Sequence, residues 1–188
     1  PVYEEEEAAL RTAYDGITSA GIPLEIVATG STPTMALESR SSLVTTMRPG
    51  NYVFYDAIQM ALGVATEEMC ALTVLCTVIA KREDGHIIVD CGSKCLGLDK
   101  GAHGNVSIVG YGKVIGHPSL VVESLSEEVG KISVNGDQSV AIGDRLRIIP
   151  NHSCSSANMT GYLTGVRGDE VVELIPVDIR GNSRKPGC

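Results

Sequence analysis

Aromatic residues are scarce in this 188-residue chain, which has no tryptophan, six tyrosines and a single phenylalanine, Phe54. A hydrophobic core must therefore be built almost entirely from aliphatic side chains. The sequence is rich in valine, isoleucine and glycine and has frequent turn residues, a texture that favours β-strands. At this length the chain can bury a real core, as one domain or as one domain with a fragment of another.

Long apolar segments and an excess of basic residues are missing as well. No run of about 18 apolar residues occurs, and no basic stretch leads into an apolar one. The formal net charge is −8, and negative charge opposes binding to phosphate backbones and to anionic lipid surfaces. We therefore expect neither nucleic acid nor a membrane among the partners of this chain.

The six cysteines, at positions 70, 76, 91, 95, 154 and 188, do not form the pattern of a secreted disulfide framework. Several lie inside apolar stretches, where an unpaired cysteine behaves as a small hydrophobic residue. This usage predicts a reducing, cytoplasmic setting.

The first fifty residues predict a helix, then a strand, then a loop of small residues. Apolar residues recur at helical spacing over 4–20, and Gly21 supplies a stop. A short apolar strand over 24–28 is followed by Gly30, Ser31 and Thr32. Small residues let backbone N–H groups approach an anion, and the hydroxyls add donors, although such a tripeptide alone is usually only a turn. Helix–strand–loop order is typical of the last units of a (β/α)₈ barrel, where phosphate is often bound.

The remainder of the chain predicts a series of strands. A β-hairpin is expected over 70–91, with its turn over 81–85. Further strands are expected over 51–55, 108–115, 119–124, 144–149, 162–166 and 171–178, with one short helix over 57–62. Asp56 precedes that helix and can cap it.

A possible metal site follows the strand over 144–149, in the stretch RIIPNHSCSSANM at 147–159. In extended backbone the side chains of His152 and Cys154 point to the same side. An imidazole nitrogen and a thiolate suit Zn²⁺, and two protein ligands leave positions open for a substrate. The pair alone is a weak signal, because a buried strand end with a plain cysteine gives the same pattern.

The segments PNHSC and SANM closely resemble the metal-binding signature of the D-threonine aldolase and D-serine dehydratase family. These are metal-activated enzymes that depend on pyridoxal phosphate and have an alanine racemase-like fold. Further matches follow in the family's order: STPT at 31–34, RPGNYVFYDAIQ at 48–59, DCGSK at 90–94, SEEVG at 126–130 and IRG at 179–181. The resemblance covers nearly the whole chain, but only the C-terminal half of the family.

The resemblance implies a mainly β fold. A C-terminal, β-barrel-like metal-binding domain (48–181) follows the last helix–strand–helix units of a TIM-type (β/α)₈ barrel (1–47), and 182–188 form a flexible tail. It also implies that Gly30, Ser31 and Thr32 bind the phosphate of pyridoxal phosphate and that His152 and Cys154 bind the metal. The family's Schiff-base lysine belongs to the absent N-terminal barrel, so no lysine here is assigned that role. We predict instead that Lys94, in a glycine-rich turn, forms an ion pair or a hydrogen bond.

The implied activity is that of a zinc- and pyridoxal-phosphate-dependent lyase for a small β-hydroxy-D-amino acid. A soft cysteine ligand favours zinc over a metal such as Mn²⁺, and within the family the His-x-Cys pair together with zinc resembles the D-serine dehydratase branch. The first choice is therefore D-serine dehydratase, which yields pyruvate and ammonia. The alternatives are D-threonine aldolase and a non-catalytic zinc-binding β domain or subunit. Partners would be the missing barrel half or a second subunit, in a homodimer, and the chain alone is expected to be inactive.

Two positions depart from the family pattern. Thr46 stands where the family commonly has glutamate, and Val129 replaces the histidine of an EEHG motif. His103, in the loop GAHGN, is interpreted as a loop histidine with a smaller chance of lining the site. The exact substrate, and the effect of these two departures on activity, stay open.

Overall fold

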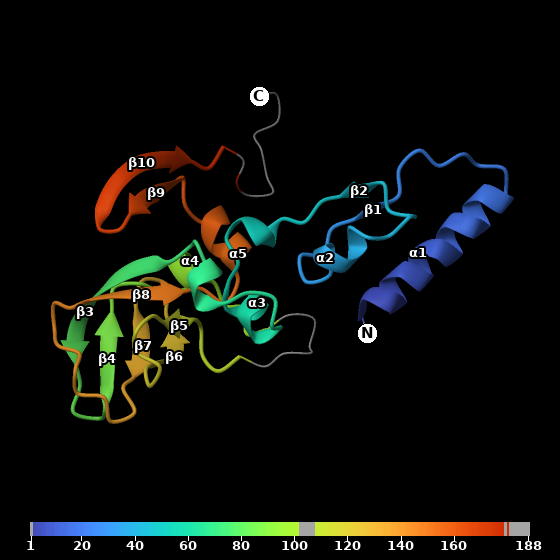
Figure 1. The fold of residues 1–188 in the computed structure, drawn as a ribbon. Helices are drawn as coiled ribbons and strands as arrows, with labels where there is room; N and C mark the ends of the chain where they lie inside the picture. Colours follow the sequence, from blue (N-terminus) through green and yellow to red (C-terminus); the bar gives the residue numbers. More distant parts are fainter. Residues whose placement is uncertain (1, 102–107, 179, 181–188) are drawn as a thin grey trace. The chain divides into compact units, whose positions relative to one another are not determined.

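The structure is a computed structural model that describes residues 2–101, 108–178 and 180 (Figure 1). The chain divides into two compact units, with the division between Val53 and Phe54. This division lies six residues after the predicted domain boundary at 47/48. His103 and the predicted tail over 182–188 lie outside the described residues.

The first unit contains the predicted helix and a small parallel sheet. Helix α1 (Val2–Ser19) has acidic residues in its first turn, where their negative charge interacts favourably with the helix dipole. Strands β1 (Ala28–Thr29) and β2 (Thr46–Met47) pair in parallel. Parallel neighbours need a crossover connection, and here it carries the short helix α2 (Met35–Glu38). The unit therefore has the helix–strand–helix order expected at the end of a (β/α)₈ barrel.

Two predicted strands of this region differ from the structure. The expected strand over 24–28 overlaps β1 only at Ala28, because Pro23 has no N–H to donate and Ile26 stays exposed. The expected strand over 51–55 is wrong. Residues Asn51–Val53 form the 3₁₀ helix η1, and Tyr55 has a φ of 51°, a left-handed conformation that no strand accommodates.

The second unit is built on a closed six-stranded barrel in the order β3-β4-β7-β6-β5-β8, in which β8 pairs with β3 (Figure 1). All neighbouring strands are antiparallel. Closure leaves no free sheet edge. The strands are β3 (Val74–Lys81), β4 (His86–Val89), β5 (Lys113–Val114), β6 (Val121–Leu125), β7 (Gly130–Ser133) and β8 (Arg145–Ile149).

An aliphatic core fills this barrel. Inward-facing residues alternate with outward-facing ones along β4 and β7, so that Ile87, Val89 and Ile132 are fully buried. The hairpin predicted over 70–91 is confirmed as β3 and β4. Strand β7 was not predicted, because the sequence around it indicates only a turn. Its first residue, Gly130, packs so closely that a Cβ there would lie 2.8 Å from the carbonyl oxygen of Cys91.

Shorter elements surround the barrel. Asp56 caps helix α3, as its position before the helix predicted. Strands β9 and β10 form an antiparallel hairpin whose residues are almost all exposed. The elements are α3 (Ala57–Ala61), η2 (Glu67–Met69), α4 (Ser93–Leu96), α5 (Ser153–Asn158), β9 (Tyr162–Arg167) and β10 (Glu170–Pro176). The predicted fold class, mainly β with a C-terminal barrel, is confirmed. In the described part of the chain, no helix is long and apolar enough to cross a membrane.

Candidate functional site

The predicted metal pair lies where the chain leaves the barrel at the end of β8. The expectation of extended backbone through Cys154 is wrong, because α5 begins at Ser153. His152 is the residue before the helix and is extended, with φ −132° and ψ 105°, whereas Cys154 lies in the first helical turn. Strand alternation therefore does not orient this pair. The turn from β8 into α5 does.

One nitrogen of the His152 ring is held by Asp99. The distance from His152 Nδ1 to Asp99 Oδ1 is 3.3 Å, and the Ser155 hydroxyl lies 3.4 Å from the same nitrogen. A carboxylate only accepts hydrogen bonds, so Nδ1 carries the proton in this pairing and Nε2 keeps its lone pair. Metal-binding histidines are commonly oriented in this way by a carboxylate.

Asn151 fixes the chain immediately before the histidine. Its side chain is buried, and its amide nitrogen donates to the carbonyl oxygens of Asp99, at 2.7 Å, and Gly110, at 2.9 Å. These two bonds tie the turn after β8 to the segment that carries Asp99. The backbone at Asp99 and the backbone before His152 are thus held together, and the two side chains meet as a result.

A glycine allows the segment with Asp99 to approach α5. Gly97 ends α4 with a φ of 72°. A Cβ at this position would lie 3.1 Å from Asp99 Oδ2 and 3.5 Å from Ser155 Cβ. The roles of Asp99, Asn151 and Gly97 were missed by sequence reasoning. Asn151 stands inside the PNHSC signature, but nothing in the sequence indicates its contact with Asp99, 52 positions earlier.

The donors available at this position are an imidazole nitrogen and a thiol sulfur. The His152 side chain is 38% exposed, and Cys154 is exposed, so both are open to solvent. Nitrogen and sulfur donors fit a borderline-soft divalent ion such as Zn²⁺. Among the described residues, no three His, Cys, Asp or Glu side chains converge on one metal position.

Lys94 forms ion pairs, as predicted. Its Nζ lies 3.2 Å from Glu127 Oε2 and 2.5 Å from Glu128 Oε1, in the turn before β7. These carboxylates raise the pKa of Lys94, so the amine stays protonated. A protonated amine is no nucleophile, which agrees with leaving Lys94 without a role in cofactor attachment.

The predicted phosphate loop lies in the first unit, at the carboxyl end of β1. Gly30 lies close to the residue that follows β2, so that a Cβ would lie 3.2 Å from the carbonyl oxygen of Arg48. Gly30 is exposed, Ser31 is half-buried, and the Thr32 side chain is buried. The residues that remain accessible to a ligand are therefore the glycine backbone and the serine.

Two carboxylates lie close to this loop. Thr34 donates to Glu6, at 3.0 Å, and also to the buried carboxylate of Glu38. Burial, followed by the hydrogen bond with Glu38, raises the pKa of Glu6 above its usual value. Burial raises the pKa of Glu38 as well, but hydrogen bonds from threonine side chains outweigh it and shift that pKa the other way, below its usual value.

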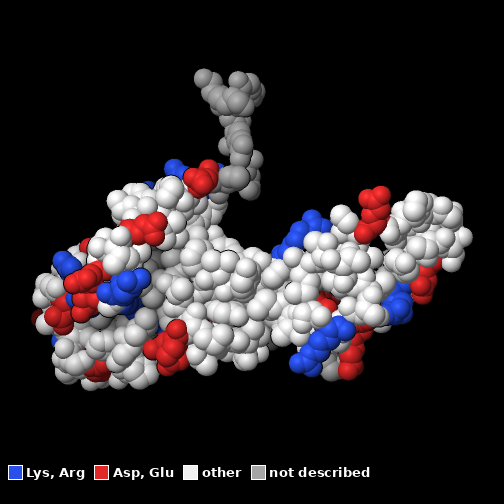
Figure 2. All heavy atoms as spheres, turned by 45° about the horizontal axis from the view of Figure 1, so that its top comes forward, with Lys and Arg blue, Asp and Glu red and all other residues white. Residues whose placement is uncertain are grey.

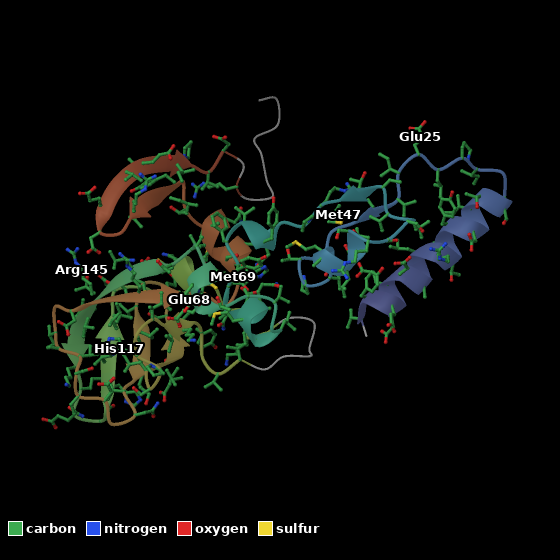
Figure 3. The ribbon with its side chains drawn as sticks, viewed as in Figure 1. Glu25, Met47, Glu68, Met69, His117 and Arg145 are labelled. Atoms are coloured by element: carbon green, nitrogen blue, oxygen red, sulfur yellow. The ribbon has the colours of Figure 1, made fainter. Side chains whose placement is uncertain are left out.

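A groove of about 950 Å³ lies between the barrel face formed by β3 and β8 and the β9–β10 hairpin. Arg145 and Arg147 of β8 line it, and Arg147 reaches Asp169 of the hairpin turn at 3.7 Å. Figure 3 shows Arg145 on the side of the barrel that carries the hairpin. Ser156 and Met159 bring the groove to α5. On the face drawn in Figure 2, acidic and basic side chains are interleaved over the barrel strands.

A family model described as a putative serine dehydratase domain matches residues 71–166, which include the barrel strands and all of α5. The chain belongs to this serine dehydratase family. The resemblance noted in the sequence is thereby confirmed, and the matched residues include the barrel and the turn after β8.

Relatives in the serine dehydratase family include enzymes of known activity. The chain is 36% identical to D-threo-3-hydroxyaspartate dehydratase of Delftia sp. (strain HT23) over 166 residues, 81% of this chain and 44% of that protein. It is 33% identical to D-serine dehydratase of Dictyostelium discoideum over 168 residues, 82% of this chain and 42% of that protein. The chain thus spans less than half the length of these relatives.

Solved structures of related enzymes also superpose on nearly all of this chain and use about half of their own length. The Delftia dehydratase superposes on 95% of this chain with a TM-score of 0.82 and 32% identity, using 50% of its own chain. D-threonine aldolase from Filomicrobium marinum superposes on 93% of this chain, with a TM-score of 0.73 and 25% identity, using 48% of its own. Solved variants of a D-threo-3-hydroxyaspartate dehydratase replace by alanine a histidine and a cysteine two positions apart, and the cysteine variant is in a metal-free form.

Proposed function

We propose that this chain carries the metal-binding half of a lyase that acts on a small β-hydroxy-D-amino acid. D-serine, converted to pyruvate and ammonia, is the leading substrate. One observation carries the proposal: a His-x-Cys pair at the barrel exit, with the histidine already held through Nδ1 by Asp99. The dehydratase variants replace a histidine and a cysteine at this same spacing.

In this proposal His152 Nε2 and Cys154 Sγ hold one divalent metal ion, for which zinc fits the donor set best. When bound, the ion supplies a Lewis acid for the β-hydroxyl oxygen of the substrate. The chain's own residues prepare this position. Asp99 keeps the proton on Nδ1, and Asn151 holds the backbone on which both His152 and Asp99 depend.

The second cofactor of the proposal is pyridoxal phosphate, which supplies an electron sink for the substrate amino group when bound. In this proposal Gly30 and Ser31 bind its phosphate by donating hydrogen bonds from a backbone N–H and a hydroxyl. Thr32, with its buried side chain, would contribute through its backbone. No lysine of this chain is given the role of holding the cofactor, so catalysis requires residues from a barrel half supplied elsewhere.

Dehydration is favoured over retro-aldol cleavage for two reasons. The relatives of highest identity reported above are dehydratases, and the aldolase structure has a lower identity and a lower TM-score. In addition, a solved dehydratase has a histidine and a cysteine two positions apart, the spacing of His152 and Cys154. A metal at the β-oxygen assists either reaction, so the products decide between them.

The metal site is tested with the purified chain and zinc, by competition against a chromophoric chelator. The wild type is expected to bind one zinc ion, and Cys154→Ala and His152→Ala to weaken binding by at least about tenfold. Cys95→Ala is the matched control, because Cys95 is also an exposed cysteine of the same unit. Equal zinc affinity in all four proteins would refute the site.

The activity is tested by joining the chain to the first half of a family dehydratase. Pyruvate from D-serine and glycine from D-threonine are measured, each with and without zinc. Zinc-dependent pyruvate is the expected product, whereas glycine would assign the chain to the aldolases. The chain alone should give no turnover, and steady pyruvate formation by the isolated chain would contradict the need for a second half.

A further inference from the structure

Asp56 is fully buried in a unit whose other aspartates are mostly at the surface, and it stands next to the candidate metal turn. We propose that Asp56 is a positioning residue that fixes the first turn of α5 and thereby the relative placement of His152 and Cys154. The inference rests on the proposed metal site and assigns to it a residue 96 positions away from His152 in the sequence.

The two oxygens of Asp56 serve two different helices. Oδ1 accepts from the backbone N–H of Gln59 at 3.0 Å, which caps α3. Oδ2 accepts from the backbone N–H of Ser153 at 2.9 Å. Ser153 is the residue between His152 and Cys154, and it is fully buried. The carboxylate therefore binds the backbone of the residue that lies between the two proposed metal ligands.

Backbone bonds extend this connection. The N–H of Ala57 donates to the carbonyl of Pro150 at 3.1 Å, and the N–H of Ile58 donates to the carbonyl of Asn151 at 3.2 Å. The start of α3 thus pairs with residues 150 and 151 by its backbone and with residue 153 through Asp56. The N–H groups of a first helical turn have no partner within the helix, so the link to Ser153 gives α5 a fixed origin.

Apolar and sulfur-containing side chains pack at the start of α3, next to the fully buried Asp56. Ala57, Cys70 and Ile149 form a buried cluster around the start of α3. Burial, followed by the charge of Asp56, raises the pKa of the Cys70 thiol to about 11, so the thiol beside Asp56 is neutral. Hydrogen bonds to a buried carboxylate are strong and directional. Asp56 therefore joins the start of α3 to the start of α5 from a fully buried position.

Two substitutions separate the joint from the helix cap. Asp56→Asn and Asp56→Ser both retain a side chain that caps helices well, so α3 keeps its start. Each has only one acceptor oxygen. If that oxygen caps α3, no acceptor remains for the N–H of Ser153. Asp144→Asn is the matched control, because Asp144 caps a turn through the N–H of Ala141 at 2.8 Å on a distant barrel loop.

The measurements are zinc affinity by chelator competition and the absorption spectrum of the cobalt-substituted chain. Cobalt reports whether the thiolate is bound and in what geometry, which a general loss of stability would not alter. Both Asp56 variants are expected to bind zinc about 10- to 100-fold more weakly than the wild type and to change the cobalt spectrum. Asp144→Asn should match the wild type in both.

Zinc affinity within twofold of the wild type in both Asp56 variants, with an unchanged cobalt spectrum, would overturn the positioning role. So would a failure of both variants to fold with zinc present, since Asp56 would then serve the fold as a whole. If wild-type zinc binding does not depend on His152 and Cys154, the metal site itself fails, and the role of Asp56 fails with it. The first outcome leaves the proposed function standing, and the last does not.

Discussion

The barrel and the β9–β10 hairpin are built from similar residues but differ in what surrounds them. Both contain strands rich in valine, leucine and isoleucine. In the barrel every strand has two neighbours, and Ile132 and Val122 are 0% exposed. In the hairpin each strand has one neighbour, and Val171 and Leu174 are 65% and 63% exposed. Apolar composition therefore predicts strands, but pairing and closure decide which strands contribute a core.

This difference bears on the candidate site. The turn that carries His152 leaves the barrel directly after Ile149, which is fully buried. Asn151 and Asp56 then connect the turn to neighbouring segments of the same unit. His152 and Cys154, the proposed metal ligands, are therefore positioned by the barrel and the segments tied to it, whereas the hairpin begins only after α5 has ended.

The largest difference in unfolding free energy is expected when one apolar side chain of each region is truncated to alanine. Ile132→Ala removes a fully buried side chain and should lower the free energy of unfolding by about 2–5 kcal/mol. Val171→Ala in the hairpin should change it by less than about 0.5 kcal/mol. Urea denaturation followed by circular dichroism measures both. Equal effects would mean that the hairpin is buried in solution, for instance against another chain.

The sequence allowed strands of the barrel to be predicted, but not the backbone conformation of the turn after β8. The β3–β4 hairpin could be predicted because alternation and a glycine turn are local signals, and the PNHSC signature singled out His152 and Cys154 as candidate metal ligands. Helix α5 could not, since its sequence SCSSAN has little helix propensity and its start is fixed by Asp56, 97 positions before Ser153. The Asp99–His152 contact is equally non-local. What was missed depends on segments that only the folded barrel brings together.

A smaller difference in stability is expected between alanine substitutions at two glycines, one beside the barrel and one beside the hairpin. A Cβ at Gly92 would overlap the backbone carbonyl oxygens of Ser126 and Glu127, which cannot move like a flexible side chain. Gly92→Ala should therefore destabilise the chain by about 1–3 kcal/mol, as overpacking does. Gly161, directly before β9, has no atom within 4 Å of that position, so Gly161→Ala should leave the urea midpoint nearly unchanged. A tolerated Gly92→Ala would show that the turn over 126–129 can shift.

Removal of zinc should have a still smaller effect and should leave both regions folded. A ligand that binds only the native state stabilises it by mass action, about 1.4 kcal/mol at ten times the dissociation constant. A chelator should remove that increment, seen as a lower thermal midpoint, with the β-sheet circular dichroism signal intact. A structural zinc would behave differently, because its removal unfolds small zinc domains. Unfolding on chelation would thus favour the non-catalytic zinc domain.

The smallest predicted effect concerns the acid stability of the barrel. Hydrogen bonds from the Ser139 hydroxyl and N–H, together with smaller contributions from Ser119 and His117, lower the pKa of Asp137 to about 2. An unfolded aspartate titrates near about 3.9, so the stabilisation is present above pH 4 and is lost as the pH falls towards 2. Asp137→Asn should therefore lower the urea midpoint at pH 6, and the gap from the wild type should close between pH 4 and pH 2. Asp169→Asn, in the fully exposed hairpin turn, should leave the midpoint unchanged at both pH values. A gap for Asp137→Asn that is as large at pH 2 as at pH 6 would show that its effect is not electrostatic.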